Sequence, residues 1–375
     1  MAHVCSFFFP QGAVHLLYLR DHCPCSRCKH PVSGQRAADV RSLPLDCMAE
    51  EVLGGEDEGK LVVVWKGEDG HRSEFSWSSV VNAARGAVAA RDAAAERPHV
   101  WNIAQEPAVG ELLGEKMSYE EYMNEPLRAL EQLHEYGLVF VKDVPIADGQ
   151  VATLGENLGP LRHTFYGRTW NVLSLPDEGQ VNLALTDVRL PMHQDLNYFE
   201  SPPGIQILNS LEFSDVSTGG ETIFIDGYDV VERLKAEQPD HYAVLKRVQV
   251  TFEYERDGQL RRFTRPTIAE GDNNRFMHLY YSPPWRGHMH MDLDDVEVFY
   301  AAYQALVQMV EDTPAVRVHL TPGTAVVFNN RRILHGRTAY AGSKVRRHLQ
   351  GCYVDEEAWR SKWRVMRKAA KGADA

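Results

Sequence analysis

Short apolar runs separated by turn residues dominate the last two thirds of the chain. Runs of roughly four to eight residues, bounded by Gly, Pro, Asn or Asp, are typical of β-strands. They predict strands at 138–141, 204–211, 222–225, 249–254, 276–281, 316–320 and 325–328. Many short strands with turns between them are typical of a β-sandwich or barrel.

Three segments show the spacing of amphipathic helices. The first, residues 118–136, begins at a predicted capping box of Ser118 and Glu121 and ends at Gly137. The others are residues 228–237 and 295–311. The last of these carries apolar residues at helical spacing, so we expect it to cover one face of the sheet.

The beginning of the chain follows a different pattern. Apolar runs at 14–19, 61–65 and 74–77 predict strands of a small β-rich domain, residues 1–95. An Ala-rich stretch with little apolar periodicity follows. We therefore expect a linker at 96–117 and a second domain at 118–375, whose basic, polar segment 364–375 frays at its end.

Composition and charge restrict the partners. Of the 375 residues, 44% are hydrophobic and 25% are charged, which is ordinary for a soluble globular protein. A net charge of −12 argues against nucleic acid or an anionic membrane surface as a partner. No apolar run reaches the roughly 20 residues of a membrane span. The N-terminus shows no basic region or cleavage site of a signal peptide, so a cytoplasmic location is expected.

Three of the six cysteines, Cys23, Cys25 and Cys28, lie within six residues. In a chain of this size, such clustering indicates a metal site in a reducing compartment rather than a disulfide framework. Three thiolates at this spacing can bind one zinc ion, which would stabilise a small domain with little core.

The zinc ion needs a fourth ligand. The candidates are His22, His30, Cys47 and His71. His22 and His30 lie so close to the cysteines that the chain has little room to wrap around the ion. We favour His71, which follows a turn between two predicted strands.

A second candidate metal site combines His193, Asp195 and His335. His193 and Asp195 are two residues apart, so on a strand they would point to the same face. Pro191 before them favours an extended backbone, and His335 follows a predicted strand and turn. Two histidines and one carboxylate leave three positions of an octahedral metal open, as in non-haem Fe(II) oxygenases.

A nearby arginine distinguishes this site from a competing pair. The competitor consists of His288 and His290, with Asp292 beyond, and no such arginine accompanies it. Twelve residues after His335 comes Arg347, whose guanidinium can bind a dicarboxylate in a bidentate manner. A 2-oxo acid that chelates Fe(II) would fill two open positions and leave one for O₂. In Thr218-Gly219-Gly220-Glu221-Thr222 the glycines allow close backbone approach, and the Thr222 hydroxyl is a second candidate anchor.

Together these motifs resemble a known family. His-x-Asp, Gly-Gly-Glu-Thr-x-Phe-x-Asp, the distal His-Gly-Arg and the trailing arginine are similar to the taurine dioxygenase-like branch of the Fe(II)/2-oxoglutarate oxygenases. The segment Leu-Arg-Asp-His-Cys-Pro-Cys-Ser-Arg-Cys resembles the zinc domain of γ-butyrobetaine and trimethyllysine dioxygenases. The resemblance covers roughly residues 14–80 and 118–365. It implies a mainly β fold with flanking helices: a double-stranded β-helix (jelly-roll) catalytic domain after a β-rich zinc-binding domain, often in a homodimer.

The resemblance also implies site residues and cofactors. It places Fe(II) at His193, Asp195 and His335, with O₂ and 2-oxoglutarate as co-substrates and zinc as a structural ion. Arg347 would bind 2-oxoglutarate, since Arg347-His348-Leu349-Gln350-Gly351 resembles the family's Arg-His-Leu-Glu-Gly. The chain is one residue shorter here than the animal enzymes, so Arg346 stays an alternative. Asn182 matches an asparagine that contacts the co-substrate.

For the substrate, the family encloses a trimethylammonium group in an aromatic cage, through cation–π attraction. Tyr166, Trp170 and Tyr353 match three walls of this cage. Leu185 stands where the animal γ-butyrobetaine enzymes have a fourth, a tyrosine. Tyr198 lies in a segment that resembles the lid after His-x-Asp.

The anionic end of the substrate is matched less closely. Animal γ-butyrobetaine hydroxylases carry an asparagine-rich segment where this chain has residues 280–286, and here Ser282 and Arg286 are the candidates. The resemblance implies hydroxylation of a small trimethylammonium zwitterion, with γ-butyrobetaine, the precursor of carnitine, as leading substrate. Alternatives are trimethyllysine, a betaine-like phosphonate, or a non-catalytic zinc-stabilised binding or sensor module.

Overall fold

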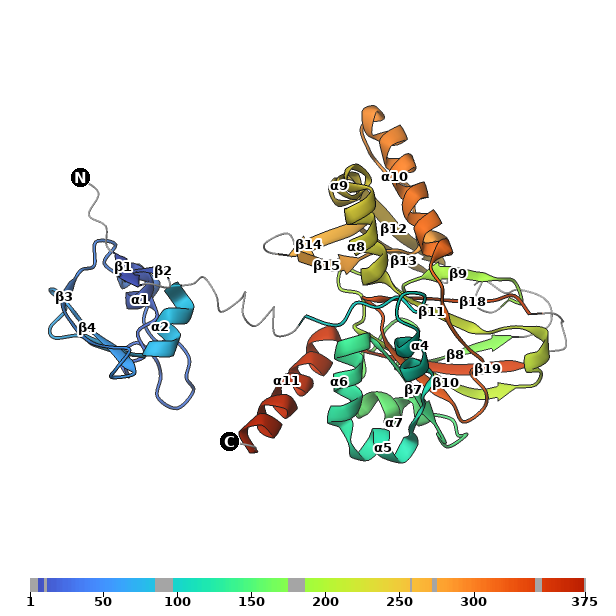
Figure 1. The fold of residues 1–375 in the computed structure, drawn as a ribbon, viewed down its shortest axis with the longest axis horizontal. Coiled ribbons are helices and arrows are strands. Elements are labelled where there is room, and N and C mark those ends of the chain that lie inside the picture. The colour runs from blue at the N-terminus through green and yellow to red at the C-terminus, as the bar shows by residue number, and fades with distance from the viewer. Residues whose placement is uncertain are drawn as a thin grey trace. The chain divides into compact units, whose positions relative to one another are not determined.

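The computed structural model describes residues 6–9, 12–84, 97–174, 186–256, 258–271, 275–340 and 346–373. The chain forms two compact units, Met1–Arg97 and Pro98–Ala375 (Figure 1). Among the described residues, none of the helices has both the length and the apolar character required to cross a membrane.

Unit 1 is small and built around two antiparallel sheets. Its elements are β1 (Ser6–Phe9), β2 (Gly12–His15), α1 (Leu16–Asp21), the 3-10 helix η1 (Val40–Ser42), β3 (Ala49–Gly55), β4 (Lys60–Trp65), β5 (Arg72–Ser76) and α2 (Trp77–Ala84). β1 pairs with β2, and β4 lies between β3 and β5. Val63 and Trp65 of β4 are almost fully buried in the core of this unit.

The prediction of one strand over residues 14–19 was wrong beyond His15. There the chain turns into α1, and the His15 side chain accepts a hydrogen bond from the Leu17 N–H as the N-cap. Leu16 and Leu19, three apart on one helical face, are buried in the same core. An apolar run this short fits either periodicity.

Unit 2 contains two facing sheets of the jelly-roll. One has the order β6-β7-β17-β10-β19-β8 and the other the order β16-β11-β18-β9. The strands are β6 (Met117–Ser118), β7 (Leu138–Lys142), β8 (Thr169–Ser174), β9 (Leu190–His193), β10 (Ile205–Phe213), β11 (Thr222–Asp226), β16 (Val316–Val318), β17 (Ala325–Asn329), β18 (Ile333–Arg337) and β19 (Arg347–Val354). Except for β6 and β7, neighbouring strands are antiparallel. The predicted fold class is confirmed.

Helices cover the outer face of the six-stranded sheet. They are α5 (Tyr119–Asn124), α6 (Pro126–Tyr136), α7 (Gln150–Glu156) and α11 (Glu356–Ala373). The helix α4 (Pro107–Gly114) instead packs in the core shared by the two sheets. The capping box of Ser118 and Glu121 is present, but the helix predicted over 118–136 is two helices. Pro126 has no N–H and opens α6 as a first-turn residue, which explains the break.

Residues 98–117, expected as a linker, belong to the core of unit 2. Trp101, Val109 and Leu113 are buried there. The Trp101 backbone N–H donates to Asp226 Oδ2 at 3.1 Å, and its indole N–H donates to the Tyr136 carbonyl at 2.8 Å. The sequence showed no periodicity here because isolated apolar residues, rather than a stripe, are buried.

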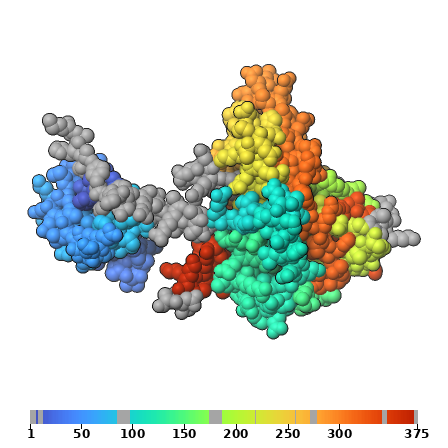
Figure 2. Space-filling model, viewed as in Figure 1, coloured from blue at the N-terminus to red at the C-terminus, as the bar shows by residue number. Residues whose placement is uncertain are grey.

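An excursion between β11 and β16 forms a separate lobe of unit 2. It contains α8 (Gly227–Glu237), α9 (Pro239–Arg247), β12 (Gln249–Arg256), β13 (Gln259–Pro266), β14 (Ile268–Gly271), β15 (Arg275–Leu279), the 3-10 helix η5 (Pro283–Trp285) and α10 (Leu293–Asp312). Figure 2 shows α9 and α10, in yellow and orange, projecting from the body of the unit. The last residues of β12 and the η5 turn help to line a pocket between the sheets.

Candidate functional site

His193 and His335 lie directly opposite each other on the antiparallel strands β9 and β18. Opposite residues in such a pair point to the same face, and their ring centroids are 4.3 Å apart. The candidate ligand atoms of His193, Asp195 and His335 all lie within 4.8 Å of one another. The structure thus brings the three predicted residues together.

Asp195 reaches this cluster from a turn, not from the strand. β9 ends at His193, so the predicted same-face arrangement of a single strand does not apply. Asn330 fixes the turn: its Oδ1 accepts the Asp195 N–H at 2.9 Å, and its Nδ2 donates to the Asp195 carbonyl at 3.0 Å. The next residue, Leu196, has φ of 61°, a left-handed conformation that is rare for leucine and typical of functional turns.

The donor set fits Fe(II). The Asp195 carboxylate lies 3.3 Å from His193 Nε2, while His193 Nδ1 donates to the Pro191 carbonyl at 2.9 Å. That bond leaves Nε2 with its lone pair toward the cluster, the usual tautomer of a metal-ligating histidine. Burial and the nearby His193 lower the pKa of His335 to about 3, so this imidazole is neutral and able to bind a cation.

The carboxyl of Asp195 is ionised in the cluster. Burial opposes ionisation, but the neighbouring His193 and His335 and a hydrogen bond from Tyr353 outweigh it and keep the pKa of Asp195 below its usual value. Two imidazoles and one carboxylate are the ligands preferred by non-haem Fe(II).

The cluster lies in a pocket of about 410 Å³. Alternate residues of β19 share one face and line it: Arg347 at one end, then Leu349, and Tyr353 at the other. Trp170 lies over Gly351 of the same strand, and a Cβ on residue 351 would overlap its indole ring. This glycine therefore leaves space for the aromatic wall.

Arg347 is a buried cation at one end of the pocket. It is 5% exposed, its Nε has no hydrogen-bond partner, and no ion pair to it is present among the described residues. Burial and the nearby Arg337 lower the pKa of Arg347 to about 9. A buried charge without a counter-charge is costly, so this position favours an anionic ligand.

The alternative, Arg346, is placed quite differently. Its side chain is 74% exposed and forms an ion pair with Glu212 at 2.9 Å. Arg346 precedes β19, and only Arg347 of these two arginines lines the pocket.

Thr222 lies at the same end, since it is paired with Arg337 across β11 and β18. Its hydroxyl is buried, has no hydrogen-bond partner among the residues that the structure describes, and lines the pocket. The chain enters β11 through Gly219 and Gly220, with φ of 104° and 80°. A Cβ on Gly219 would collide with the Ala339 carbonyl, so the close approach expected of these glycines occurs against the neighbouring chain segment.

Aromatic side chains form the other end of the pocket. The predicted residues Tyr166, Trp170, Tyr198 and Tyr353 all line it. The Trp170 and Tyr353 rings lie 5.3 Å apart, and the hydroxyls of Tyr166 and Tyr198 are 3.4 Å apart. Asn182 and Leu185 lie outside the described residues.

The structure does not place Ser282 and Arg286 among the pocket-lining residues. Ser282 is fully buried, and the Arg286 guanidinium lies 4.6 Å from the Tyr303 ring centroid on α10. The lining also includes residues that the sequence analysis missed: Gln206, Tyr254, Arg256, Pro284 and Trp285. A signal was available for Tyr254, which ends the strand predicted at 249–254, but Arg256 lies two residues beyond that prediction, and the pocket they line was not predictable.

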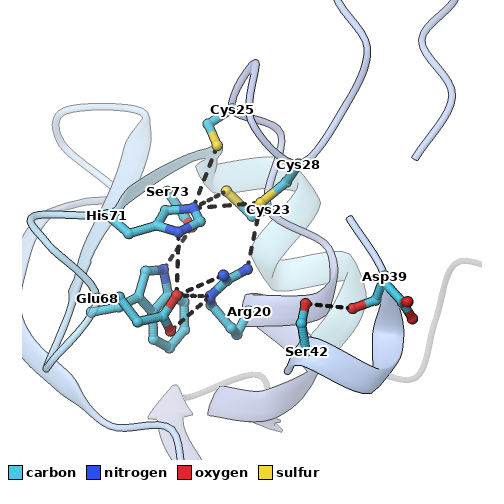
Figure 3. A network of polar contacts seen from close by, with 10 residues as sticks. Arg20, Cys23, Cys25, Cys28, Asp39, Ser42, Glu68, His71 and Ser73 are labelled. Carbon is cyan, nitrogen blue, oxygen red and sulfur yellow. Dashed lines mark hydrogen bonds and ion pairs between the residues drawn. The ribbon is translucent and has the colours of Figure 1, made fainter. Parts of the chain in front are cut away.

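In unit 1 the three cysteines surround His71 (Figure 3). His71 Nε2 lies 3.3 Å from Cys23 Sγ, 3.4 Å from Cys25 Sγ and 3.5 Å from Cys28 Sγ. These distances are those of tetrahedral ligands around an ion about 2.0–2.3 Å away. The four residues are therefore a good fit to zinc.

The surroundings of His71 orient it for this role. Glu68 Oε2 lies 3.3 Å from His71 Nδ1 and forms an ion pair with Arg20 at 2.6 Å (Figure 3). A carboxylate on the second ring nitrogen fixes the tautomer of a metal-binding histidine. Arg20 Nη1 also donates to Cys28 Sγ at 3.5 Å, so the same arginine contacts both Glu68 and a cysteine of the cluster.

The other candidates for the fourth ligand are elsewhere. His22 hydrogen-bonds the Tyr18 carbonyl at 2.8 Å, His30 accepts the Ser33 N–H at 3.1 Å, and Cys47 is packed in the core of unit 1. Within the described part of the chain, two groups of three or more potential metal ligands occur. One is the three cysteines with His71, and the other is the triad of His193, Asp195 and His335. The competing pair His288 and His290 is in neither.

A jelly-roll with a two-histidine, one-aspartate cluster beside a buried arginine defines an oxygenase-type active site. Residues 105–353 match the family described as taurine catabolism dioxygenase TauD, TfdA. Residues 10–80 match the family described as gamma-butyrobetaine hydroxylase-like, N-terminal. The chain belongs to the TauD/TfdA dioxygenases, whose members use Fe(II), 2-oxoglutarate and O₂.

Individual relatives cover most of the chain. It is 32% identical over 370 residues to dioxygenase str8 of Strobilurus tenacellus, with 93% of this chain and 84% of the relative covered. It is 30% identical to gamma-butyrobetaine dioxygenase of Pseudomonas sp. (strain AK-1), covering 94% and 90%. It is 28% identical to the mitochondrial trimethyllysine dioxygenase of Gallus gallus, covering 91% and 80%. The chain is thus a dioxygenase similar to the γ-butyrobetaine and trimethyllysine enzymes, as the sequence predicted.

Proposed function

We propose that this dioxygenase hydroxylates a quaternary-ammonium zwitterion, and that γ-butyrobetaine, which gives carnitine, is the leading substrate. The observation that carries the proposal is one pocket. It holds the His193, Asp195 and His335 cluster, the unpaired Arg347 and a wall of aromatic rings. Each of these features matches a different part of one reaction: the metal, the co-substrate and a cationic substrate.

In this proposal His193, Asp195 and His335 hold Fe(II). Arg347 binds the distal carboxylate of 2-oxoglutarate, with the Thr222 hydroxyl as a second donor. Asn182 stays a proposed contact of the co-substrate. When bound, Fe(II) with 2-oxoglutarate and O₂ supplies the oxidising power for attack on an unactivated C–H bond, and the protein supplies positioning.

The aromatic wall holds the cation of the substrate. Tyr166, Trp170 and Tyr353 line the pocket, and each desolvated cation–π contact contributes about 0.5–2 kcal/mol. Tyr198, in the segment that resembles the family's lid, extends this wall, and its ring lies 5.8 Å from that of Trp285. Leu185 is proposed to stand at the place of the fourth cage residue, a tyrosine in the animal γ-butyrobetaine enzymes.

We also propose zinc at Cys23, Cys25, Cys28 and His71. Its role is structural, because four protein ligands leave no position open for a substrate. The proposal further includes a homodimer, implied by the resemblance, and a cytoplasmic location, which suits thiolate ligands that must stay reduced.

Two substrate alternatives are kept. Trimethyllysine is one, because the chain is similar to trimethyllysine dioxygenase. A betaine-like phosphonate is the other, because Leu185 and the segment 280–286 depart from the pattern of the animal γ-butyrobetaine enzymes. A non-catalytic binding or sensor role is the third alternative. The assembled triad argues against it, since its three ligands and Arg347 are all in place.

The test is 2-oxoglutarate turnover. Purified protein with Fe(II), 2-oxoglutarate and O₂ should release succinate faster when γ-butyrobetaine is added, and mass spectrometry should show a product heavier by one oxygen. Trimethyllysine and the phosphonate are assayed in parallel. His193→Ala should abolish succinate release; persistent activity in this variant, or no stimulation by any of the three amines, would overturn the proposal.

A further inference from the structure

A third arginine lines the pocket, at a place that the co-substrate does not explain. Arg256 is the last residue of β12 and is exposed, so it lies at an opening of the pocket. β12 ends in a hairpin with β13, in which Arg256 is opposite Gln259.

The position of Arg256 follows from the order of residues along the strands. On β19, Arg347 and Tyr353 are six residues apart, which is roughly 20 Å in an extended strand. Tyr353 donates to Asp195 Oδ2 at 3.0 Å, so it marks the metal cluster, and Arg347 marks the co-substrate end.

Arg256 belongs to the aromatic side of the pocket. Tyr254 and Arg256 are two apart on β12 and share one face. The Tyr254 ring lies 5.3 Å from Tyr198 and 5.1 Å from Trp285. Arg256 therefore lies about 7 Å further along the strand than Tyr254, which belongs to the aromatic wall.

The other charged residues of the pocket have different roles. Asp195 belongs to the metal cluster and Arg347 faces the co-substrate end. Arg337 Nη2 donates to the carbonyls of Thr186 and Val188, which fixes it against the neighbouring chain. Among the described lining residues, Arg256 is thus the cation placed beside the aromatic wall.

We propose that Arg256 binds the anionic group of the substrate and thereby selects a zwitterion over a simple quaternary amine. The inference rests on the proposed function and assigns to Arg256 the role that the sequence analysis gave to Ser282 and Arg286. A guanidinium can donate two parallel N–H bonds to a carboxylate or phosphonate, and the aromatic wall takes the ammonium.

The geometry also explains why Arg286 is unsuited to this role. Its guanidinium lies 4.6 Å from the Tyr303 ring centroid and 5.7 Å from that of Tyr300, both on α10. It does not line the pocket. Arg256, by contrast, combines a lining position with access from solvent, which lets an incoming anion meet it first.

The experiment compares two substrates in two proteins. Succinate release is measured for the wild type and Arg256→Gln, with γ-butyrobetaine and with its carboxamide, which keeps the trimethylammonium group but has no charge at the other end. In the wild type, kcat/KM should be about tenfold higher for the zwitterion, as expected for a charge-assisted pair. In Arg256→Gln the two compounds should be used equally, through a rise in KM for the zwitterion alone.

Arg262→Gln is the matched control. Arg262 lies on the same hairpin, pairs with Glu253 and does not line the pocket, so its loss should leave the preference unchanged. Arg256→Lys should restore part of it. If the wild type uses both compounds equally, or Arg256→Gln keeps the preference, the role of Arg256 is refuted while the proposed function stands. If the wild type uses neither compound, γ-butyrobetaine is not its substrate and this inference fails with that assignment; the proposed function fails as well if trimethyllysine and the phosphonate also give no stimulation.

Discussion

The Tyr353 hydroxyl donates a hydrogen bond of 3.0 Å to Asp195 Oδ2, so one residue belongs both to the aromatic wall and to the surroundings of the metal cluster. Asp195 Oδ1 is the oxygen that lies 3.3 Å from His193 Nε2. Tyr353 therefore occupies one carboxylate oxygen and leaves the other toward the metal position. It is buried, and burial raises the pKa of its phenol well above the ordinary value, so it remains a donor.

Tyr353→Phe should weaken metal binding about tenfold, the usual effect of losing a hydrogen bond that orients a metal ligand. The ring stays, so the aromatic wall is kept. Mn(II) titration followed by electron paramagnetic resonance measures the affinity directly, without turnover. Tyr122→Phe, which removes a buried hydroxyl bonded to the Leu154 carbonyl away from the pocket, is the control. Equal affinity in Tyr353→Phe and wild type would show that the bond does not orient Asp195.

Arg347→Gln should raise the Kd of 2-oxoglutarate about a hundredfold, because the ligand loses its buried counter-charge. Arg346→Gln should change it less than about twofold, since an exposed ion pair contributes little. Anaerobic titration of the Fe(II)-loaded protein with 2-oxoglutarate, followed by absorbance, gives both constants. A larger rise of this Kd in Arg346→Gln than in Arg347→Gln would show that Arg346 binds 2-oxoglutarate.

Much of the metal cluster could be predicted from sequence because its determinants are local. His193 and Asp195 are two residues apart, and His335 adjoins a recognisable strand and turn. What the sequence did not reveal is how Asp195 arrives there. The residue in the left-handed conformation is Leu196, not a glycine or asparagine that would have indicated it, and the turn depends on Asn330, 135 positions after Asp195.

The substrate end was predicted less well for the same physical reason. Trp285 and Tyr254 meet only because η5 and β12 are brought together by the fold, with ring centroids 5.1 Å apart. Neither local sequence indicates that these two residues are in contact. The division of residues 118–136 into two helices, by contrast, was predictable, because Pro126 is visible in the sequence and cannot continue a helix from the preceding turn.

In unit 1, Cys25→Ser should remove zinc and destabilise the unit. The zinc content measured by metal analysis should fall from one ion per chain to nearly none, and His71→Ala should have the same effect. Cys47→Ser, His22→Ala and His30→Ala should keep the metal, as their side chains lie outside the cluster. Zinc retained in His71→Ala but lost in one of these three variants would identify a different fourth ligand.

Gly351→Ala should act on the substrate through Trp170. The added Cβ overlaps the indole ring and must displace it from the wall. The KM for the quaternary amine should rise by about 3–30-fold, the range expected for losing one cation–π contact. Trp170→Leu should raise the KM for the quaternary amine to a similar extent. A substrate in which a tert-butyl group replaces trimethylammonium should respond much less; an equal loss with both compounds would mean that the wall acts by apolar packing alone.

The stability of the lobe between β11 and β16 should depend on pH through Glu270. Burial opposes ionisation of this carboxyl, but Lys246, Tyr242 and Lys235 bond to it and keep the pKa of Glu270 below its ordinary value. Because the folded-state pKa is the lower one, the stabilisation is complete above the unfolded value, about 4.3, and is lost as pH falls through the folded value.

Glu270→Gln should therefore reduce the free energy of unfolding at pH 7 by about 0.5–1 kcal/mol, a modest effect because solvent screens these lysines. The difference from wild type should shrink steadily between about pH 5 and pH 3. Urea unfolding at several pH values measures it, with Glu237→Gln, an exposed carboxylate of α8, as control. A difference that stayed constant down to pH 3 would show that Glu270 acts through its shape and not its charge.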